Sequence, residues 1–229
     1  MKFLVIEGLD GSGKSTQVQL LKQWLEDKDQ PYEYLHFPRT DSPVYGELVA
    51  RFLRGEFGRN EDVNPYLVAL LFAGDQASAA DSIERWKAEN KFVLVDRYVY
   101  SNMAYQAAKF DAEKDQTELM NWIIKTEFDH FKIPVPDLSL YLKVPVDFVK
   151  NRLASLRTGS EREYLKGKND IHEADIKFQL KVRQMYQTIA EKIDNLHILD
   201  CSDQYGNMMA AEDIFQRMIE HLKGEKILK

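Results

Sequence analysis

The stretch Gly8-Leu9-Asp10-Gly11-Ser12-Gly13-Lys14-Ser15 decides how the rest of the chain is interpreted. Its spacing, G-x-x-x-x-G-K-[ST], is typical of a phosphate-binding P-loop. The glycines let the backbone turn tightly, so that peptide N–H groups point inward and form a nest for phosphate oxygens. We expect Lys14 to bind the β- and γ-phosphates of a nucleotide, and the Ser15 hydroxyl to be a ligand of Mg²⁺.

The sequence on either side of this loop supports the same interpretation. Phe3-Leu4-Val5-Ile6 is a short apolar run of the kind that forms a buried parallel strand. After the loop, apolar residues recur at helical spacing from Lys14 to about Glu26. The positive end of this helix dipole also favours phosphate. Strand, loop and helix therefore follow in the order that the motif requires, which a chance glycine turn would not show.

The composition is that of a mid-sized domain in a reducing compartment. The 229 residues carry a formal net charge of -6, so a general nucleic-acid-binding surface is not expected. One cysteine, Cys201, excludes an internal disulfide, and we expect it to be a buried small residue near a strand end. Because neither a membrane-spanning run nor a signal peptide is recognised, the sequence predicts a cytoplasmic protein without membrane partners.

Short apolar segments alternate with helical patterns along the chain, which predicts an α/β fold with a parallel sheet covered by helices on both faces. The predicted strands are residues 2–7, 32–37, 92–96, 138–143 and 196–200. A long helix is predicted from Pro65, with Asn64 as its N-cap, to about Glu89, and a last helix from about Met208 to Leu222. Without repeats or linkers, residues 1–229 are expected to form one domain.

A second landmark ends the third predicted strand, in Phe92-Val93-Leu94-Val95-Asp96-Arg97-Tyr98. In P-loop enzymes an aspartate at the tip of a neighbouring strand helps to hold Mg²⁺. Asp96 falls opposite Ser15 if the first and third strands are adjacent. Arg97 follows directly, and its forked guanidinium suits a second phosphate group. The alternative is an ordinary Asp-Arg turn at a strand end.

At this point the chain resembles the thymidylate kinase family, whose members transfer phosphate from ATP to dTMP. The discriminating residues are Asp96-Arg97-Tyr98, Ser101 and Ala104-Tyr105-Gln106. Three further stretches also resemble the family, namely Phe37-Pro38-Arg39-Thr40, Leu70-Leu71-Phe72-Ala73 and Asp170-Ile171-His172-Glu173. The resemblance implies a P-loop NTPase fold with a five-stranded parallel sheet and a short lid near residues 157–170. It also implies Mg²⁺, ATP as co-substrate, and a homodimer.

The resemblance implies roles for individual residues. Arg39 and Arg97 would bind the dTMP phosphate, Asp10 would meet the sugar 3′-hydroxyl, and Tyr105 would favour deoxyribose. Gln106 would hold the base edge. The implied substrate-binding residues are Asp10, Phe37, Pro38, Arg39, Phe72, Gln76, Arg97, Ser101, Tyr105, Gln106 and Tyr164. The implied ATP-binding residues are Gly8, Leu9, Asp10, Gly11, Ser12, Gly13, Lys14, Ser15, Thr16 and Arg152. The implied catalytic residues are Lys14, Asp96, Arg97, Arg157 and Arg162.

Recognition of the base is where this sequence departs from the family. Phe72 would stack on the pyrimidine, although it could instead pack against the sheet. Four residues later the family usually has an arginine that donates to thymine O4, and here the residue is Gln76. An amide donates without a charge, and it can also turn over and accept from an amino group. Thymine selectivity is therefore left open.

The lid follows Arg152, which resembles the family arginine that stacks on adenine. The P-loop itself has no arginine, so a cation for the migrating phosphoryl group must come from elsewhere. Arg157 and Arg162 are the candidates, in a polar stretch that could otherwise be a solvated loop. We expect this loop to close over both nucleotides and exclude water.

The chain has five histidines. The histidines lack metal-ligand spacing and are interpreted as packing or surface residues. They are His36, His130, His172, His197 and His221. Two other functions stay open. A P-loop deoxynucleoside kinase has a neutral sugar acceptor and would need a carboxylate base, whereas a nucleotide-binding module would not turn over a small substrate.

Overall fold

The centre of the molecule is a five-stranded parallel sheet with the order β2-β3-β1-β4-β5. The computed structural model describes residues 2–154, 164–166, 170–172 and 175–228. The strands are β1 (Phe3–Gly8), β2 (Tyr32–His36), β3 (Phe92–Asp96), β4 (Leu138–Lys143) and β5 (Leu196–Asp200). All five predicted strands are confirmed, with β1 displaced by one residue and β2 shorter by one residue.

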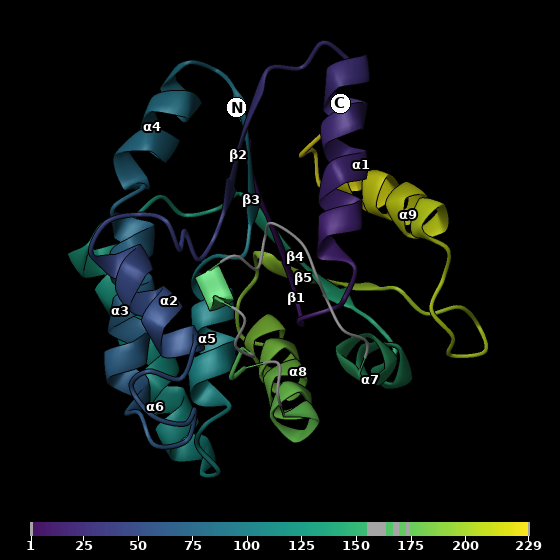
Figure 1. Cartoon of the computed structure of the whole chain (residues 1–229). Coiled ribbons are helices and arrows are strands. Elements are labelled where there is room, and N and C mark those ends of the chain that lie inside the picture. The colour runs from purple at the N-terminus through teal and green to yellow at the C-terminus, as the bar shows by residue number, and fades with distance from the viewer. Residues whose placement is uncertain (1, 155–163, 167–169, 173–174, 229) are drawn as a thin grey trace.

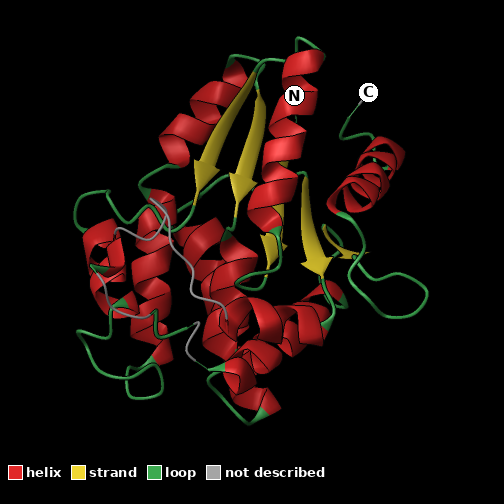
Figure 2. Ribbon diagram, turned by 45° about the vertical axis from the view of Figure 1, so that its right-hand side comes forward, coloured by secondary structure: helices red, strands yellow, loops and turns green. Residues whose placement is uncertain are grey.

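The burial of the strands explains their sequences. Every residue of β1 and β3 is buried, because these strands lie inside the sheet and helices cover both of its faces. The edge strand β2 is only half-buried and carries polar residues. In Figure 2 the strands run in one direction toward a group of helices. The loops that leave the carboxyl ends of β1, β2 and β3 therefore meet at one edge, where α/β proteins bind ligands.

The helices form layers on the two sides of this sheet. They are α1 (Lys14–Asp27), α2 (Tyr45–Leu53), α3 (Pro65–Ala77), α4 (Ala80–Ala88), α5 (Val99–Ala107), α6 (Glu113–Ile124), the π-helical turn η1 (Lys125–His130), α7 (Val146–Ala154), α8 (Ile176–Ala190) and α9 (Ala211–Gly224). Figure 1 shows α1 and α9 together beside the sheet, and α5 and α8 together on its other side. Within the ranges given above, no helix combines the length and apolar character needed to cross a membrane.

The prediction of one long helix from Pro65 to about Glu89 is wrong, because α3 and α4 are separate helices. The break lies where the carbonyl oxygen of Asp75 is used by other donors. It accepts from Arg39 Nη2 at 2.7 Å and from Ser78 Oγ at 2.8 Å. The N–H of Ala79 donates to the carbonyl of Gln76 instead, which tightens the chain to 3₁₀ spacing and ends α3.

Other details of the helix ends follow equally local causes. Asn64 is the predicted N-cap of α3, and its Oδ1 accepts from the N–H of Tyr66 at 2.9 Å. The last helix begins at Ala211 rather than near Met208, because Met208 forms an antiparallel bridge with Ser202. Cys201 is buried directly after β5, as expected, and burial raises the pKa of its thiol to about 12.

Candidate active site

The phosphate-binding loop joins β1 to α1 and has the backbone that its glycines allow. Gly11 and Gly13 have φ values of 74° and 85°, in the left-handed region that favours glycine. Gly8 is needed for space, since a Cβ at this position would lie 2.6 Å from the hydroxyl oxygen of Ser12. The predicted strand, tight loop and helix are thus confirmed.

Lys14 lies across the loop that precedes it. Its Nζ donates to the carbonyl oxygens of Gly8 at 3.3 Å and Leu9 at 3.1 Å. Burial, together with the nearby charge of Arg97, lowers the pKa of Lys14 to about 8. A phosphate anion is a stronger acceptor than a peptide carbonyl, so the ammonium group can exchange these bonds for bonds to phosphate oxygens.

Asp96 lies beside the loop, because β3 is the neighbour of β1 and Asp96 pairs in register with Ile6. Its Oδ2 is 3.3 Å from Nδ1 of His36, whereas its buried Oδ1 finds no hydrogen-bond partner in the described part of the chain. Burial raises the pKa of Asp96, but Lys14 and His36 together lower it by more than burial raises it. The net shift is therefore downward. An ionised carboxylate with an unused oxygen suits a divalent cation, and the hydroxyl-bearing Ser15 is exposed at the start of α1.

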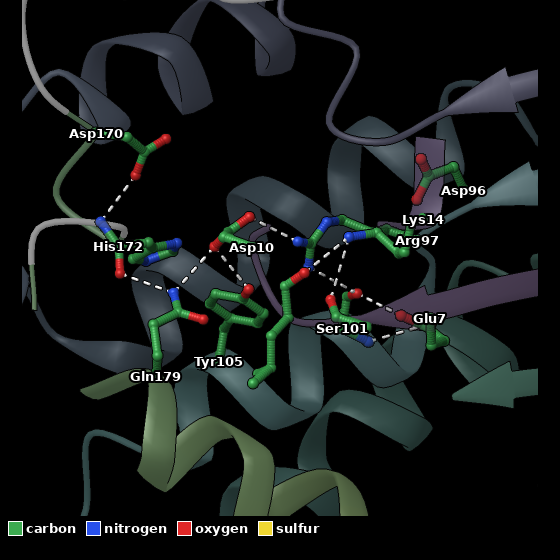
Figure 3. Close-up of polar contacts among 12 residues, drawn as sticks. Glu7, Asp10, Lys14, Asp96, Arg97, Ser101, Tyr105, Asp170, His172 and Gln179 are labelled. Atoms are coloured by element: carbon green, nitrogen blue, oxygen red, sulfur yellow. Dashed lines mark hydrogen bonds and ion pairs between the residues drawn. The ribbon is translucent and has the colours of Figure 1, made fainter. Parts of the chain in front are cut away.

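Arg97 connects the tip of β3 to the phosphate-binding loop. Its backbone has a φ of 66°, and its N–H donates to the carbonyl of Ile6 at 3.0 Å. Its Nη2 donates to Asp10 Oδ1 at 2.7 Å. The other oxygen of Asp10 accepts from Tyr105 Oη at 2.7 Å and from Gln179 Nε2 at 3.0 Å. Groups from the β3 tip, α5 and α8 therefore fix the loop aspartate (Figure 3).

Glu7, near the end of β1, binds the start of α5 and the side chain of Tyr186 of α8. Its Oε1 accepts from the N–H groups of Tyr98 at 3.1 Å and Ser101 at 3.3 Å, at the start of α5. Its Oε2 accepts from the hydroxyls of Ser101 and Tyr186, the latter at 2.9 Å. Burial raises the pKa of Glu7 to about 7, against the effect of these donors and of Arg97. The Ser101 hydroxyl, a predicted substrate ligand, is thus engaged with Glu7.

Arg39 belongs to a second cluster at the end of β2. Its N–H donates to Asp75 Oδ2 at 2.8 Å and its Nε donates to Asp75 Oδ1 at 3.0 Å. Phe37, after β2, is buried with its ring centroid 5.7 Å from that of Tyr98, and the Phe37–Pro38 peptide bond is cis. Asp75 of α3 therefore binds the Arg39 side chain, whereas Asp10 of the loop binds the Arg97 side chain.

A third set of residues, the base-side group, consists of Phe72, Gln76, Gln106 and His172. The rings of Phe72 and His172 are nearly parallel, with an interplanar angle of 18° and centroids 6.4 Å apart. Phe72 is half-buried and packs against a small apolar cluster that contains Phe52, rather than against the sheet.

The polar atoms of the base-side group are buried but have unused hydrogen-bonding capacity. Gln76 Oε1, both amide atoms of Gln106 and Nε2 of His172 have no hydrogen-bond partner among the described residues. Burial, followed by the charge of Lys109, lowers the pKa of His172 to about 3, so its imidazole is neutral. Buried polar groups normally have partners, so this pattern is typical of a site that a polar ligand completes.

Within the predicted lid, the structure describes residues 164–166 and 170–172. Tyr164 Oη donates to Asp170 Oδ2 at 2.7 Å, and the Tyr164 carbonyl accepts from Arg54 Nη1 at 2.7 Å. A cavity of about 260 Å³ lies between this segment and α2, lined by Thr40, Asp41, Glu47, Ala50, Arg54, Tyr164 and Lys166. Arg152 is exposed on α7 and Thr16 is exposed on α1. The candidate catalytic residues Arg157 and Arg162 lie outside the described residues.

Sequence reasoning missed four residues that organise this site. Glu7 could have been noticed as a charged residue at the end of an otherwise apolar strand. Asp75 could have been noticed as an acidic residue within an apolar helix. Gln179 and His172 gave no such indication, because their contacts with Asp10 and Phe72 join segments that are far apart in the sequence.

Comparison with known proteins gives one consistent result. The family model "Thymidylate kinase" matches residues 6–211. A probable thymidylate kinase from Pyrococcus horikoshii is 33% identical over 226 residues, which cover 97% of this chain and 96% of that protein. A thymidylate kinase from Mycobacterium tuberculosis is 31% identical over 187 residues, covering 82% and 85% of the two chains.

A solved structure shares the fold. The solved structure of thymidylate kinase from Candida albicans superposes with a TM-score of 0.72 at 24% identity, over 98% of this chain and 92% of that one. The family match spans the phosphate-binding loop, the Asp96-Arg97 turn and α8. The chain therefore belongs to the thymidylate kinase family.

Proposed function

We propose that this protein transfers the γ-phosphoryl group of ATP to dTMP, giving ADP and dTDP for dTTP synthesis. The observation that carries the proposal is the ion pair between Arg97 and Asp10, at 2.7 Å. This pair joins a guanidinium suited to an acceptor phosphate to the loop suited to a triphosphate. Two phosphate anions approach each other only if cations lie between them, because like charges repel.

The donor nucleotide binds along the loop of residues 8–16. Peptide N–H groups and the N-terminus of α1 hold the phosphates, and Lys14 turns from the carbonyls of Gly8 and Leu9 to the β- and γ-phosphates. Arg152, exposed on α7, stacks on the adenine. Asp96 and Ser15 would hold Mg²⁺, and the bound ion would neutralise charge on the transferred phosphoryl group.

The acceptor nucleotide binds on the other side of Asp10. Arg97 and Arg39 bind the monophosphate, and Arg39 is held in place for this purpose by Asp75. Asp10 accepts a hydrogen bond from the sugar 3′-hydroxyl. Tyr105, which fixes Asp10, fills the position of a ribose 2′-hydroxyl and so favours a deoxynucleotide.

The base-side group binds the pyrimidine. Phe72 stacks on the ring, and Gln76 and Gln106 meet polar atoms of the base edge with neutral amides. His172 contributes a neutral imidazole whose Nε2 has no partner in the described ranges. Base recognition thus rests on hydrogen bonds between uncharged groups, each of which is costly to leave unmade.

The reaction needs positioning and charge neutralisation rather than a general base. The acceptor phosphate has a second pKa of about 6 and is already anionic at neutral pH. Lys14, Arg97 and the lid residues Arg157 and Arg162 neutralise the charge of the migrating group. Asp10 is a poor base, because Arg97 and Lys14 outweigh burial and hold its pKa well below the ordinary value. This observation argues against a deoxynucleoside kinase.

A coupled assay of ADP release tests the proposal. The purified protein, Mg²⁺ and ATP are combined separately with dTMP, dUMP, dCMP and thymidine. We expect rapid ADP release with dTMP and none with thymidine. Phosphorylation of thymidine at a comparable rate would identify a deoxynucleoside kinase, and ATP binding without phosphotransfer to any acceptor would identify a binding module.

We further infer that residues 1–229 form one catalytic domain with a lid near residues 157–170, and that two copies form a homodimer. Support for the dimer comes from α3, where Leu67 and Leu70 are 63% and 39% exposed. Light scattering of the wild type and of a Leu67→Glu variant tests this inference. We expect the variant to have the mass of a monomer, and a monomeric wild type would contradict the inference.

A further inference from the structure

Two histidines and a glutamate from separate parts of the chain meet at the end of the molecule opposite the phosphate-binding loop. His197 is the second residue of β5, and His221 and Glu225 lie at the end of α9. One ligand atom from each of the three lies within 4.8 Å of the others. No pattern in the sequence predicts the group, because twenty-three residues separate the two histidines.

Rigid elements hold all three side chains. His197 lies on the edge strand β5 and pairs in register with Leu140 of β4. The N–H of Glu225 donates to the carbonyl of His221 at 3.0 Å, so these two residues are one full helical turn apart and share a face of α9. The strand β5 therefore presents His197, and the carboxyl end of α9 presents His221 and Glu225.

Hydrogen bonds select the tautomer that a metal ion requires. Nε2 of His197 lies 3.1 Å from the carbonyl oxygen of Asp194, which can only accept, so this nitrogen carries the proton. Nδ1 of His197 therefore carries a lone pair and accepts from Nε2 of His221 at 2.9 Å, and it lies 3.9 Å from Glu225 Oε1. A backbone carbonyl that orients a histidine in this way is the usual outer partner of a metal ligand.

The two distances from His197 Nδ1 to the other ligand atoms are close to those around a small cation. Two imidazole nitrogens on one tetrahedral Zn²⁺, at about 2.0–2.1 Å each, stand roughly 3.3 Å apart. The observed 2.9 Å and 3.9 Å differ from this value by about half an ångström. When the ion enters, it takes the place of the proton on His221 Nε2, and His221 then carries its proton on Nδ1.

We propose that His197, His221 and Glu225 form a binding site for a divalent transition-metal ion such as Zn²⁺, which joins β5 to the end of α9. Two imidazoles and one carboxylate are donors that select Zn²⁺ and its neighbours over Mg²⁺. Three protein ligands leave a position for water. Because the site lies at the start of β5, away from the carboxyl ends of the strands, it is separate from the nucleotide site and independent of the proposed phosphotransfer.

Calorimetric titration of the tag-free full-length protein with Zn²⁺, without nucleotide, tests the proposal. We expect one tight site per chain, with affinity reduced at least about tenfold in His221→Gln. Zn²⁺ at about 100 times its Kd should raise the unfolding midpoint of the wild type by about 5–10 °C, because the ion binds only the folded chain. Co²⁺ should give the absorption bands of a four-coordinate ion.

Matched variants make the outcome decisive. His130→Gln alters an exposed histidine on η1 and should bind Zn²⁺ like the wild type. Glu225→Gln, at an exposed helix end, keeps the fold even if His221→Gln is destabilised, and it should also weaken binding. Equal Zn²⁺ affinity in the wild type, His221→Gln and Glu225→Gln would overturn the proposal, as would a loss of affinity in His130→Gln as large as in His221→Gln.

Discussion

The phosphate side and the base side of the candidate active site are built in opposite ways. On the phosphate side, Asp10 and Asp96 are charged and already have cations beside them, Arg97 and Lys14. On the base side, Gln76, Gln106 and His172 are neutral, and their buried polar atoms lack partners within the described ranges. Phosphates therefore bind by exchange of partners, whereas a base binds by completing bonds that the empty site leaves unmade. We expect single charges to control rate and single hydrogen bonds to control selectivity.

The largest effect should come from removing the cation that faces the acceptor phosphate. We expect Arg97→Ala to lower kcat/KM for dTMP by about 10²–10³, the cost typical of losing one preorganised donor to a reacting anion. ATP affinity, measured by calorimetry, should change little. Arg97→Lys keeps the charge without the forked guanidinium. Its kcat/KM for dTMP should lie between those of the wild type and of Arg97→Ala. An equal loss of ATP binding in Arg97→Ala would contradict a role confined to the acceptor.

A smaller effect should follow from the titration of Lys14. Its pKa of about 8 means that the free enzyme loses this charge as the pH rises above 8. ATP binds the ammonium form, so binding above that pH requires uptake of a proton. We expect the apparent Kd for ATP to rise by about tenfold per pH unit above pH 8. Calorimetry in two buffers of different ionisation enthalpy should detect the proton, and an ATP affinity that is constant from about pH 7 to pH 9.5 would exclude this titration.

A substitution on the base side should change the selectivity between acceptors more than the rate of phosphotransfer. Arginine only donates, whereas the amide of Gln76 both donates and accepts. We expect Gln76→Arg to raise the preference for dTMP over dCMP by about tenfold, within the range for one well-placed hydrogen bond. The ratio of kcat/KM values for the two acceptors measures it. Gln23→Arg, on the exposed face of α1, is the matched control. An unchanged ratio would place Gln76 away from the base edge.

The same contrast explains how much of the site could be predicted from the sequence. The phosphate side is encoded in two contiguous stretches, the loop and the Asp96-Arg97 turn. Each follows a buried strand, and the alternation of strands with helices can be predicted from the sequence. The base side is assembled from α3, α5 and the segment at His172. The helix break at Ser78 and the orientation of Arg39 both depend on one carbonyl of Asp75, which no local pattern indicates.

The smallest effect concerns stability, and it tests whether the base side is neutral. Burial first, and then Lys109, lower the pKa of His172 to about 3, from an ordinary value of 6.5. Between these values the unfolded chain binds a proton that the folded chain does not, so stability falls as the pH falls below 6.5. From pH 6.5 to pH 5.5 this titration lowers the free energy of unfolding of the wild type by about 1 kcal/mol. The His172→Phe variant should not show this decrease. Urea unfolding at the two pH values measures the difference, with His130→Phe, at an exposed position, as the control. If both variants kept the full acid sensitivity of the wild type, the folded chain would protonate His172 as readily as the unfolded chain does, and the base side would gain a charge at mildly acidic pH.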